Sequence, residues 1–292
     1  MEPEVYTNLV DSIHDHLPLL HRYVRLRKKL LGLEELHMYD LYVPMVADQD
    51  AKIPRQDAVE MVQTGLHPLG EQYLRDLGAS FTDGWIDWLE NRGKTSGAYS
   101  WGTYGVHPYV LLNHQDTLND VFTLAHELGH AMHTFYSNKN QEFVNAGYTI
   151  FVAEVASTLN EALLMDDLLN KTEEPKRRAY LLNHFLEQFR GTVFRQTMFA
   201  EFEIIVHGRV GEGESLTSDK LSEIYYDLNK KYYGDDIVID EAIAMEWARI
   251  PHFYRPFYVY KYATGFSAAI SLSQQILREG EPAVLRYLEF LG

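Results

Sequence analysis

The amino-acid sequence predicts a mainly α-helical protein with one small β-sheet placed just ahead of a long helix. Apolar residues recur at helical spacing over most of the 292 residues, and only one short stretch, rich in glycine and aromatic residues, departs from this pattern. The composition, with 46% hydrophobic and 23% charged residues, is that of an ordinary globular chain. No repeat or Ser/Gly/Pro-rich linker divides the sequence, so we expect residues 1–292 to form one domain.

Helical spacing and end signals locate the expected helices. The first is expected over residues 5–31, with a break near Pro18. A long helix is expected over residues 117–136, because Thr117 with Asp120 resembles a capping box at its start. The remaining helices are expected over residues 58–77, 85–89, 150–169, 177–205, 216–229 and 242–250, and as two helices within 265–291.

The short sheet is expected just before the long helix. Residues 96–105 are rich in glycine and aromatic side chains, and residues 107–113 form a brief apolar run bounded by turn-type residues. Because Pro108 begins this run, we expect an edge strand there. Such an edge could pair with the backbone of an extended peptide; the alternative is a sheet that only covers the helix.

Charge and cysteine content exclude several function classes. The formal net charge of −16 repels nucleic-acid phosphates and anionic membrane surfaces, so we expect neither as a partner. With no cysteine, the chain has no disulfides, thiol nucleophile or Cys-ligated metal, which fits the reducing cytoplasm. The sequence shows no transmembrane run and no secretory signal. The 13 histidines and 20 tyrosines suit a solvent-filled cleft.

The long predicted helix carries an HExxH pattern at residues 126–130. His126 and His130 are four residues apart, so both imidazoles lie on one helical face and can bind one metal ion. Glu127 is one step round the helix, where its carboxylate can reach a water activated by the metal. The alternative is a pair of histidines on an ordinary amphipathic helix.

A carboxylate on the next helix completes the expected site. A catalytic zinc ion takes three protein ligands and keeps one position for water. Glu154 lies 24 residues after His130, within an apolar stretch where a carboxylate needs a partner. Glu161, seven residues further on nearly the same face, could accept a hydrogen bond from the other nitrogen of a histidine ligand. The alternative for both glutamates is an exposed charge.

A third segment offers hydrogen-bond donors. Between His252 and Gly265, five of fourteen residues are His or Tyr. Phenol and imidazole groups can donate to the oxyanion that develops on a reacting carbonyl. By itself the segment is equally typical of aromatic packing.

Together, these segments resemble a known family. The motifs His126-Glu-Leu-Gly-His-Ala-Met-His133 and Ala153-Glu-Val-Ala-Ser-Thr158 and the aromatic segment 252–265 are similar to those of oligoendopeptidase F, a bacterial branch of the thimet-oligopeptidase-like zinc metallopeptidases. Segments 33–42 and 194–203 agree as well, so the resemblance covers nearly the whole chain. It implies a zincin-like helical catalytic domain with a deep channel and zinc at its floor, acting on short peptides in the cytoplasm.

Site residues carry over from the family motif by motif. The resemblance implies that His126, His130 and Glu154 bind one Zn²⁺ and that Glu127 is the general base. The aromatic donors of the family fall within residues 252–262, and we favour Tyr258 and Tyr260, with His252 as a substrate contact. The choice between Tyr258 and Tyr260 as the oxyanion donor stays open. Members of the family are about twice as long, so residues 1–292 are expected to be the catalytic half without the N-terminal domain.

The resulting hypothesis is a zinc-dependent endopeptidase that hydrolyses internal bonds of short peptides. Glu127 would take a proton from the attacking water and deliver it to the leaving amine. A zinc carboxypeptidase with the same ligands is an alternative, as is a zinc-stabilised peptide-binding fragment with little turnover. A purely structural helical protein fits the sequence least well.

Overall fold

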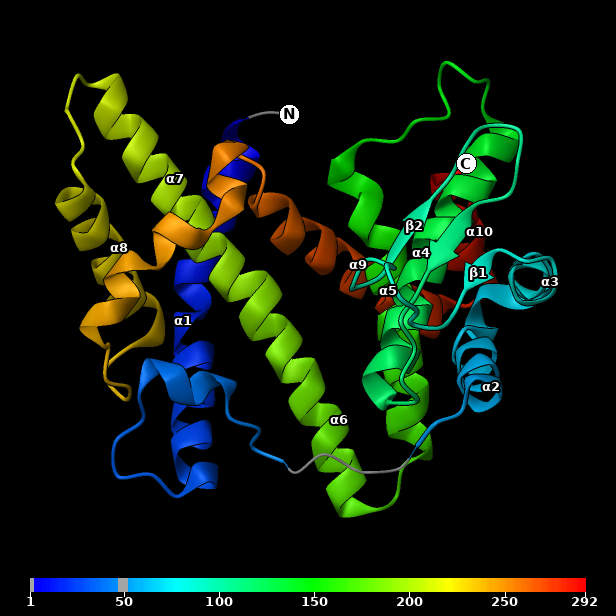
Figure 1. Ribbon diagram of the computed structural model, residues 1–292, viewed down its shortest axis with the longest axis horizontal. Helices are drawn as coiled ribbons and strands as arrows, with labels where there is room; N and C mark the ends of the chain where they lie inside the picture. Colours follow the sequence, from blue (N-terminus) through cyan, green and yellow to red (C-terminus); the bar gives the residue numbers. More distant parts are fainter. Residues whose placement is uncertain (1–2, 47–51) are drawn as a thin grey trace. The chain divides into compact units, whose positions relative to one another are not determined.

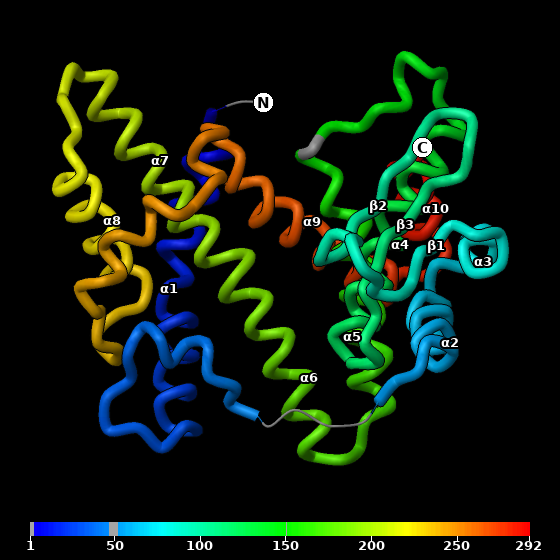
Figure 2. The backbone as a smooth tube through the Cα atoms, viewed as in Figure 1, coloured from blue at the N-terminus to red at the C-terminus, as the bar shows by residue number. Residues whose placement is uncertain are grey.

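The computed structural model describes residues 3–46 and 52–292 and is mainly helical, as predicted. The chain divides into two compact units (Figures 1 and 2). The first comprises Met1–Asp48 and Leu182–Thr264, and the second comprises Gln49–Leu181 and Gly265–Gly292. Within the described ranges, no helix has both the length and the apolar character needed to cross a lipid bilayer.

The first unit is built on three packed helices. Helices α1 (Pro3–Leu31), α7 (Arg195–Gly211) and α8 (Ser218–Tyr233) contact one another. The expected break at Pro18 is wrong, because α1 continues through it. Leu17 and Leu20 are buried on either side of the proline, and their packing holds the two halves of the helix in line despite the lost backbone hydrogen bond.

Several shorter elements complete this unit. The predicted helix over 177–205 is one continuous helical run whose middle residues are π-helical, and the one over 242–250 is a 3-10 helix. Helix α6 begins in the second unit and ends in the first, and helix α9 begins in the first unit and continues into the second. The elements concerned are η1 (Met38–Tyr42), α6 (Pro175–Gln188), η3 (Phe189–Phe194), η4 (Glu241–Arg249), η5 (Pro251–Tyr254) and α9 (Tyr260–Glu279).

The second unit gathers helices around the HExxH segment. Its helices are α2 (Arg55–Gly65), η2 (His67–Leu69), α3 (Gly70–Thr82), α4 (Leu118–Asn140), α5 (Ile150–Lys171) and α10 (Glu281–Leu291). The single helix expected over 58–77 is therefore two helices with a 3-10 turn between them. Pro68 lies in that turn, and Gly70 follows it with φ +85°, a left-handed conformation that glycine adopts without steric cost.

A three-stranded sheet lies beside α4 in this unit. Its strands are β1 (Ile86–Asp87), β2 (Tyr99–Trp101) and β3 (Tyr109–Leu111), in the order β1-β3-β2. The helix expected over 85–89 is thus wrong, because residues 86 and 87 pair in parallel with Val110 and Leu111 of β3.

The expectation of an edge strand at 107–113 is also wrong. β3 is the central strand, antiparallel to β2 with Trp101 opposite Tyr109. Its N–H groups are used on the β1 side as well, since Val110 donates to the Trp85 carbonyl at 2.8 Å. Pro108 precedes the strand and so costs it no ladder hydrogen bond. A peptide cannot pair with β3, because β1 and β2 occupy its two sides and are themselves the edge strands.

One local feature fixes the start of α4, and two others position it against α5. The predicted capping box is confirmed: the Asp120 N–H donates to the Thr117 hydroxyl at 3.2 Å, and the Asp120 carboxylate accepts from the Thr117 N–H at 2.9 Å. Gly129 allows the helix backbones to touch, because a Cβ there would lie 2.5 Å from the Ser157 Cα. Asn160 of α5, fully buried, donates to the Ala125 carbonyl at 3.1 Å. The face of α4 that carries the histidines is therefore held close to α5.

Candidate metal centre

The two histidines of α4 and one glutamate of α5 converge. The Glu154 Oε2 atom lies 3.4 Å from His126 Nε2 and 3.7 Å from His130 Nε2. One ligand atom from each of the three side chains lies within 4.8 Å of the other two. All three side chains are partly exposed, between 18% and 28%, so an ion has access from solvent.

The separations fit a shared metal ion better than a hydrogen-bonded cluster. Ligands at ~2.1 Å in a tetrahedral zinc site lie about 3.4 Å from one another. The two measured separations are close to that value, whereas charge-assisted hydrogen bonds between nitrogen and oxygen are shorter. Two imidazoles and one carboxylate also form a three-ligand set that leaves a fourth position for water.

Glu161 orients the His126 ring, as the sequence suggested. The His126 Nδ1 atom lies 2.6 Å from Glu161 Oε1, which directs Nε2 toward Glu154. Burial alone would lower the pKa of His126. The hydrogen bond and charge of Glu161, with the charges of Glu154 and Glu127, outweigh burial and raise this pKa to about 9.

His130 is in the opposite electrostatic situation. Burial is the largest cause that lowers its pKa, followed by the neighbouring charges of His126 and His133, and together they bring it to about 3 despite a hydrogen bond to the Ala153 backbone. The ring is therefore neutral at physiological pH and keeps a lone pair for a cation.

Glu127 has the properties expected of a general base. Its side chain is buried, and the Oε2 atom has no hydrogen-bond partner within the described part of the chain. Burial raises the pKa of Glu127 to about 7; His126 opposes this shift, and the negative charges of Glu154 and Glu161 add to it. A carboxylate with such a pKa can both accept and release a proton near neutral pH.

The aromatic segment in the first unit contains a compact His–Tyr cluster. The rings of His252 and Tyr258 are stacked 5.7 Å apart. The Tyr262 hydroxyl lies 3.3 Å from His252 Nε2 and 3.4 Å from the Tyr258 hydroxyl. Two of the predicted residues, His252 and Tyr258, therefore lie together, and Tyr262 joins them.

Tyr260 has different surroundings. It is only 5% exposed, and its ring packs against Tyr6 of α1 at 4.7 Å. Burial raises the pKa of its hydroxyl. The two tyrosines favoured from the sequence, Tyr258 and Tyr260, thus contact different partners within the same unit.

A strained residue immediately precedes Tyr258. Phe257 adopts φ +58°, a left-handed conformation that is unfavourable for a residue with a side chain. Its N–H donates to the buried Glu203 carboxylate at 2.9 Å, and its ring contacts His207 at 4.9 Å and Tyr6 at 5.6 Å. Three side chains therefore hold this turn immediately before Tyr258.

Sequence reasoning did not identify several of these supporting residues. Gly129 and Asn160 had a detectable signal, since one is a glycine within a helix and the other an amide within an apolar helix. Glu203 and His207 lie four apart on α7 but carried no motif that pointed to Phe257. The backbone conformation of Phe257 left no trace in the sequence.

Known bacterial proteins are similar to this chain in sequence. The chain is 57% identical to oligopeptidase PepF of Bacillus subtilis over 288 residues, covering 99% of this chain and 43% of that protein. It is 48% identical to an oligoendopeptidase F homolog of Lactococcus lactis, covering 99% of this chain and 48% of that protein. The chain therefore spans a little under half the length of these relatives.

Solved structures agree with the sequence comparison. A crystal structure from Chlamydophila abortus matches all of this chain and 49% of its own, with a TM-score of 0.91 and 44% identity. The structure of oligoendopeptidase-F from Enterococcus faecium matches all of this chain and 45% of its own, with a TM-score of 0.77 and 40% identity. The model of peptidase family M3 matches residues 1–291. The chain belongs to peptidase family M3.

Proposed function

We propose that this chain is the catalytic half of a zinc-dependent oligoendopeptidase that hydrolyses internal bonds of short peptides. The observation that carries the proposal is the convergence of His126, His130 and Glu154, with the buried Glu127 on the same helix, whose Oε2 atom has no hydrogen-bond partner among the described residues. Membership in family M3 and the names of the relatives, oligopeptidase PepF and oligoendopeptidase F, support it.

Zinc is the metal we propose for the three ligands. Two imidazoles and a carboxylate, with Glu161 behind His126, form the donor set and outer hydrogen bond of a catalytic zinc site. When bound, the ion polarises the scissile carbonyl and makes the attacking water more acidic.

Glu127 moves the proton in this proposal. Its carboxylate accepts the proton of the attacking water and then delivers it to the nitrogen of the leaving amine. The raised pKa of Glu127 near 7 suits both steps, because neither proton position is strongly favoured. Its burial keeps competing hydrogen-bond donors away from the reacting oxygen.

We propose Tyr258 as the hydroxyl that stabilises the oxyanion, with His252 as the substrate contact. The contacts of Tyr258 with His252 and Tyr262 favour it over Tyr260, which is buried against Tyr6. Removing one such donor commonly costs about 3 kcal/mol of transition-state stabilisation. Short peptides are the proposed partners, and the cysteine-free composition supports a cytoplasmic location.

The decisive experiment changes Glu127 alone. In Glu127→Gln, hydrolysis of a quenched fluorescent peptide is expected to fall at least about a hundredfold while bound zinc is retained. Glu71→Gln is the matched control, because Glu71 lies on α3 with its side chain 91% exposed. Unchanged turnover in the Glu127 variant would reject the assigned role.

Product masses separate the alternatives. Internal cleavage of a C-terminally amidated peptide supports an endopeptidase. Release of single residues that requires a free C-terminus identifies a carboxypeptidase. Peptide binding without cleavage after long incubation identifies a binding fragment.

A further inference from the structure

We propose that a polar cleft at the start of α4 is a subsite for a cationic group of the peptide, either a Lys or Arg side chain or the N-terminal ammonium. The inference rests on the proposed function, since it assigns a substrate class to the region beside the same metal centre. It is drawn from the hydrogen-bonding capacity and charge of the cleft.

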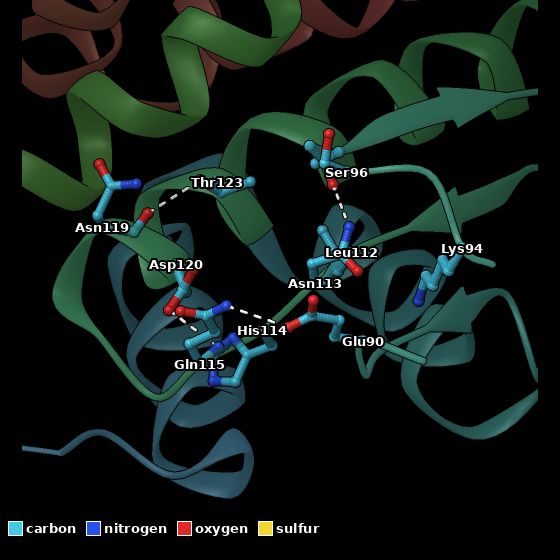
Figure 3. A pocket seen from close by; sticks show the side chains of 12 residues that line it. Glu90, Lys94, Ser96, Leu112, Asn113, His114, Gln115, Asn119, Asp120 and Thr123 are labelled. Atoms are coloured by element: carbon cyan, nitrogen blue, oxygen red, sulfur yellow. Dashed lines mark hydrogen bonds between the residues drawn. The ribbon is translucent and has the colours of Figure 1, made fainter. Parts of the chain in front are cut away.

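The cleft lies wholly within the second unit. Its volume of about 430 Å³ can hold a long side chain. Three segments form it: the residues around Lys94 to Ala98, the chain that leaves β3, and the first turns of α4 (Figure 3). Figure 3 shows Asn119 and Thr123 on the helix and Glu90 on a facing segment.

The cleft and the metal centre share one face of α4. Asn119, Thr123 and His126 follow one another at spacings of four and three residues, so they lie along one stripe. At a rise of about 1.5 Å per residue, the cleft begins ~5 to 10 Å from His126. An extended peptide advances about 3.3 Å per residue, so the cleft is reached two or three residues from the scissile bond.

Two nitrogen donors of the cleft, on Lys94 and Asn113, already have partners in the protein. Lys94, whose side chain is 4% exposed, contacts the Asp87 carboxylate at 3.2 Å and donates to the Leu89 carbonyl at 2.8 Å. The Asn113 amide nitrogen donates to the carbonyls of Thr95 and Gly97 at 3.0 and 2.8 Å.

Two acceptor atoms on residues that line the cleft are in a different situation. Asn113 Oδ1 and His114 Nδ1 are buried and lack a hydrogen-bond partner within the described ranges. His114 is 7% exposed, and its Nε2 lies 3.4 Å from the Ile53 carbonyl and 3.5 Å from the Asp116 carboxylate. Because both of these partners are acceptors, Nε2 carries the proton and Nδ1 is left as an acceptor.

The charge of the lining favours a cation over a neutral hydrogen-bond donor as the group bound in the cleft. The Lys94 ammonium is neutralised by Asp87, while Glu90 and Asp120 contribute two carboxylates to the lining. Asp120 is held by the Thr117 N–H and hydroxyl, whereas Glu90 is exposed and accepts from the Gln115 side-chain amide at a longer 3.4 Å, so Glu90 supplies the more accessible charge. The two carboxylates repel an anionic group, whereas an ammonium or guanidinium pairs with them and can donate to the acceptors that have no partner.

The test measures peptide binding separately from turnover. The zinc-supplemented full chain carrying Glu127→Gln is titrated into fluorescein-labelled octapeptides that carry Arg or norleucine at one position at a time. We expect Arg at one position to bind about tenfold more tightly than norleucine, because it forms charge-assisted hydrogen bonds with otherwise unpaired acceptors. A parallel peptide series with a free or acetylated amino terminus, labelled at a C-terminal lysine, distinguishes a side chain from the terminal ammonium.

Variants of Glu90 assign the preference to this cleft. Glu90 is exposed, so Glu90→Gln and Glu90→Lys are expected to fold normally. The preference for Arg should shrink in Glu90→Gln and reverse in Glu90→Lys, while the exposed control Glu71→Lys leaves it unchanged. Equal binding of all peptides, no binding of any peptide, or an unaltered preference in Glu90→Lys would overturn the proposal.

The outcome is separable from that of the proposed function. If the wild-type chain cleaves no peptide but the preference for Arg is intact, the peptidase activity is rejected and the subsite is retained. Cleavage without any Glu90-dependent preference would reject the subsite alone.

Discussion

At the scale of single residues, the two histidines proposed as zinc ligands differ in protonation state before metal binding. The pKa of His126 is raised to about 9, whereas that of His130 is lowered to about 3. The difference arises because Glu161 hydrogen-bonds one ring while burial dominates the other. Only His126 must lose a proton before it can bind zinc.

This difference predicts the proton release that accompanies zinc binding. At pH 8, His126 is protonated and Glu127, with a pKa near 7, is mostly ionised, so zinc should displace about one proton per chain. Zinc affinity should therefore rise with pH up to about 9 and level off above it. Calorimetric titrations in buffers of different ionisation enthalpy measure the released protons. Finding none at pH 8 would contradict the assignment.

At the scale of elements, the α4–α5 contact positions Glu154, the proposed third ligand. A Gly129→Ala side chain would lie 2.5 Å from the Ser157 Cα, so α5 must move away and take Glu154 with it. We expect zinc affinity to fall at least tenfold and stability to fall by about 1–3 kcal/mol. Both are measurable by chelator competition and chemical unfolding.

Gly78→Ala is the matched control for this change. Gly78 lies within α3, and a Cβ there meets nothing within 4 Å. The substitution should leave zinc binding unchanged and be neutral or stabilising, because alanine favours the helix. If Gly129→Ala and Gly78→Ala changed zinc affinity and stability equally, the close contact between α4 and α5 would not be what determines zinc binding.

The turn at Phe257 predicts a positioning role for Glu203. Glu203→Leu removes the acceptor that holds the left-handed Phe257 N–H, so Tyr258 should lose its fixed orientation. We expect kcat to fall about tenfold with KM little changed, as for an interaction made in the transition state.

Glu203→Gln separates this role from general loss of packing. The amide retains an oxygen that can accept from Phe257, so it should restore most of kcat. If the wild-type chain and the folded Glu203→Leu variant had equal kcat, Glu203 would have no role in positioning Tyr258.

At the scale of the whole molecule, metal binding should appear as stability. Zinc holds residues from α4 and α5 together in the folded chain only, so a thousandfold excess over Kd should add about 4 kcal/mol. Melting temperature should rise with zinc and fall with chelator in the wild-type chain. Glu154→Gln should lose this response, and an identical rise in that variant would exclude Glu154 as a ligand.

Much of the architecture follows from the sequence because it depends on local patterns. Helical spacing and the Thr117 capping box located α4, and the ligand spacing anticipated that Glu154 would meet His126. Glu161 could be anticipated for the same reason, since it lies seven residues along the same helix as Glu154.

The remainder depends on contacts distant in sequence. Pairing of residues 86–87 with β3 overrode the helical pattern of 85–89 and made β3 central, which Pro108 alone could not reveal. The division into two units depends on which helices pack together, and the separate surroundings of Tyr258 and Tyr260 depend on Tyr6 and Glu203, far along the chain.

The backbone contact at Gly129 also makes the centre intolerant of length changes. One residue inserted between Glu154 and Ser157 would leave Ser157 against Gly129 but rotate the carboxylate about 100° around the axis of α5. Such an insertion would keep every amino acid of the centre but turn the Glu154 carboxylate away from His126 and His130. The spacing of these two residues is therefore as important to the proposed centre as their identity.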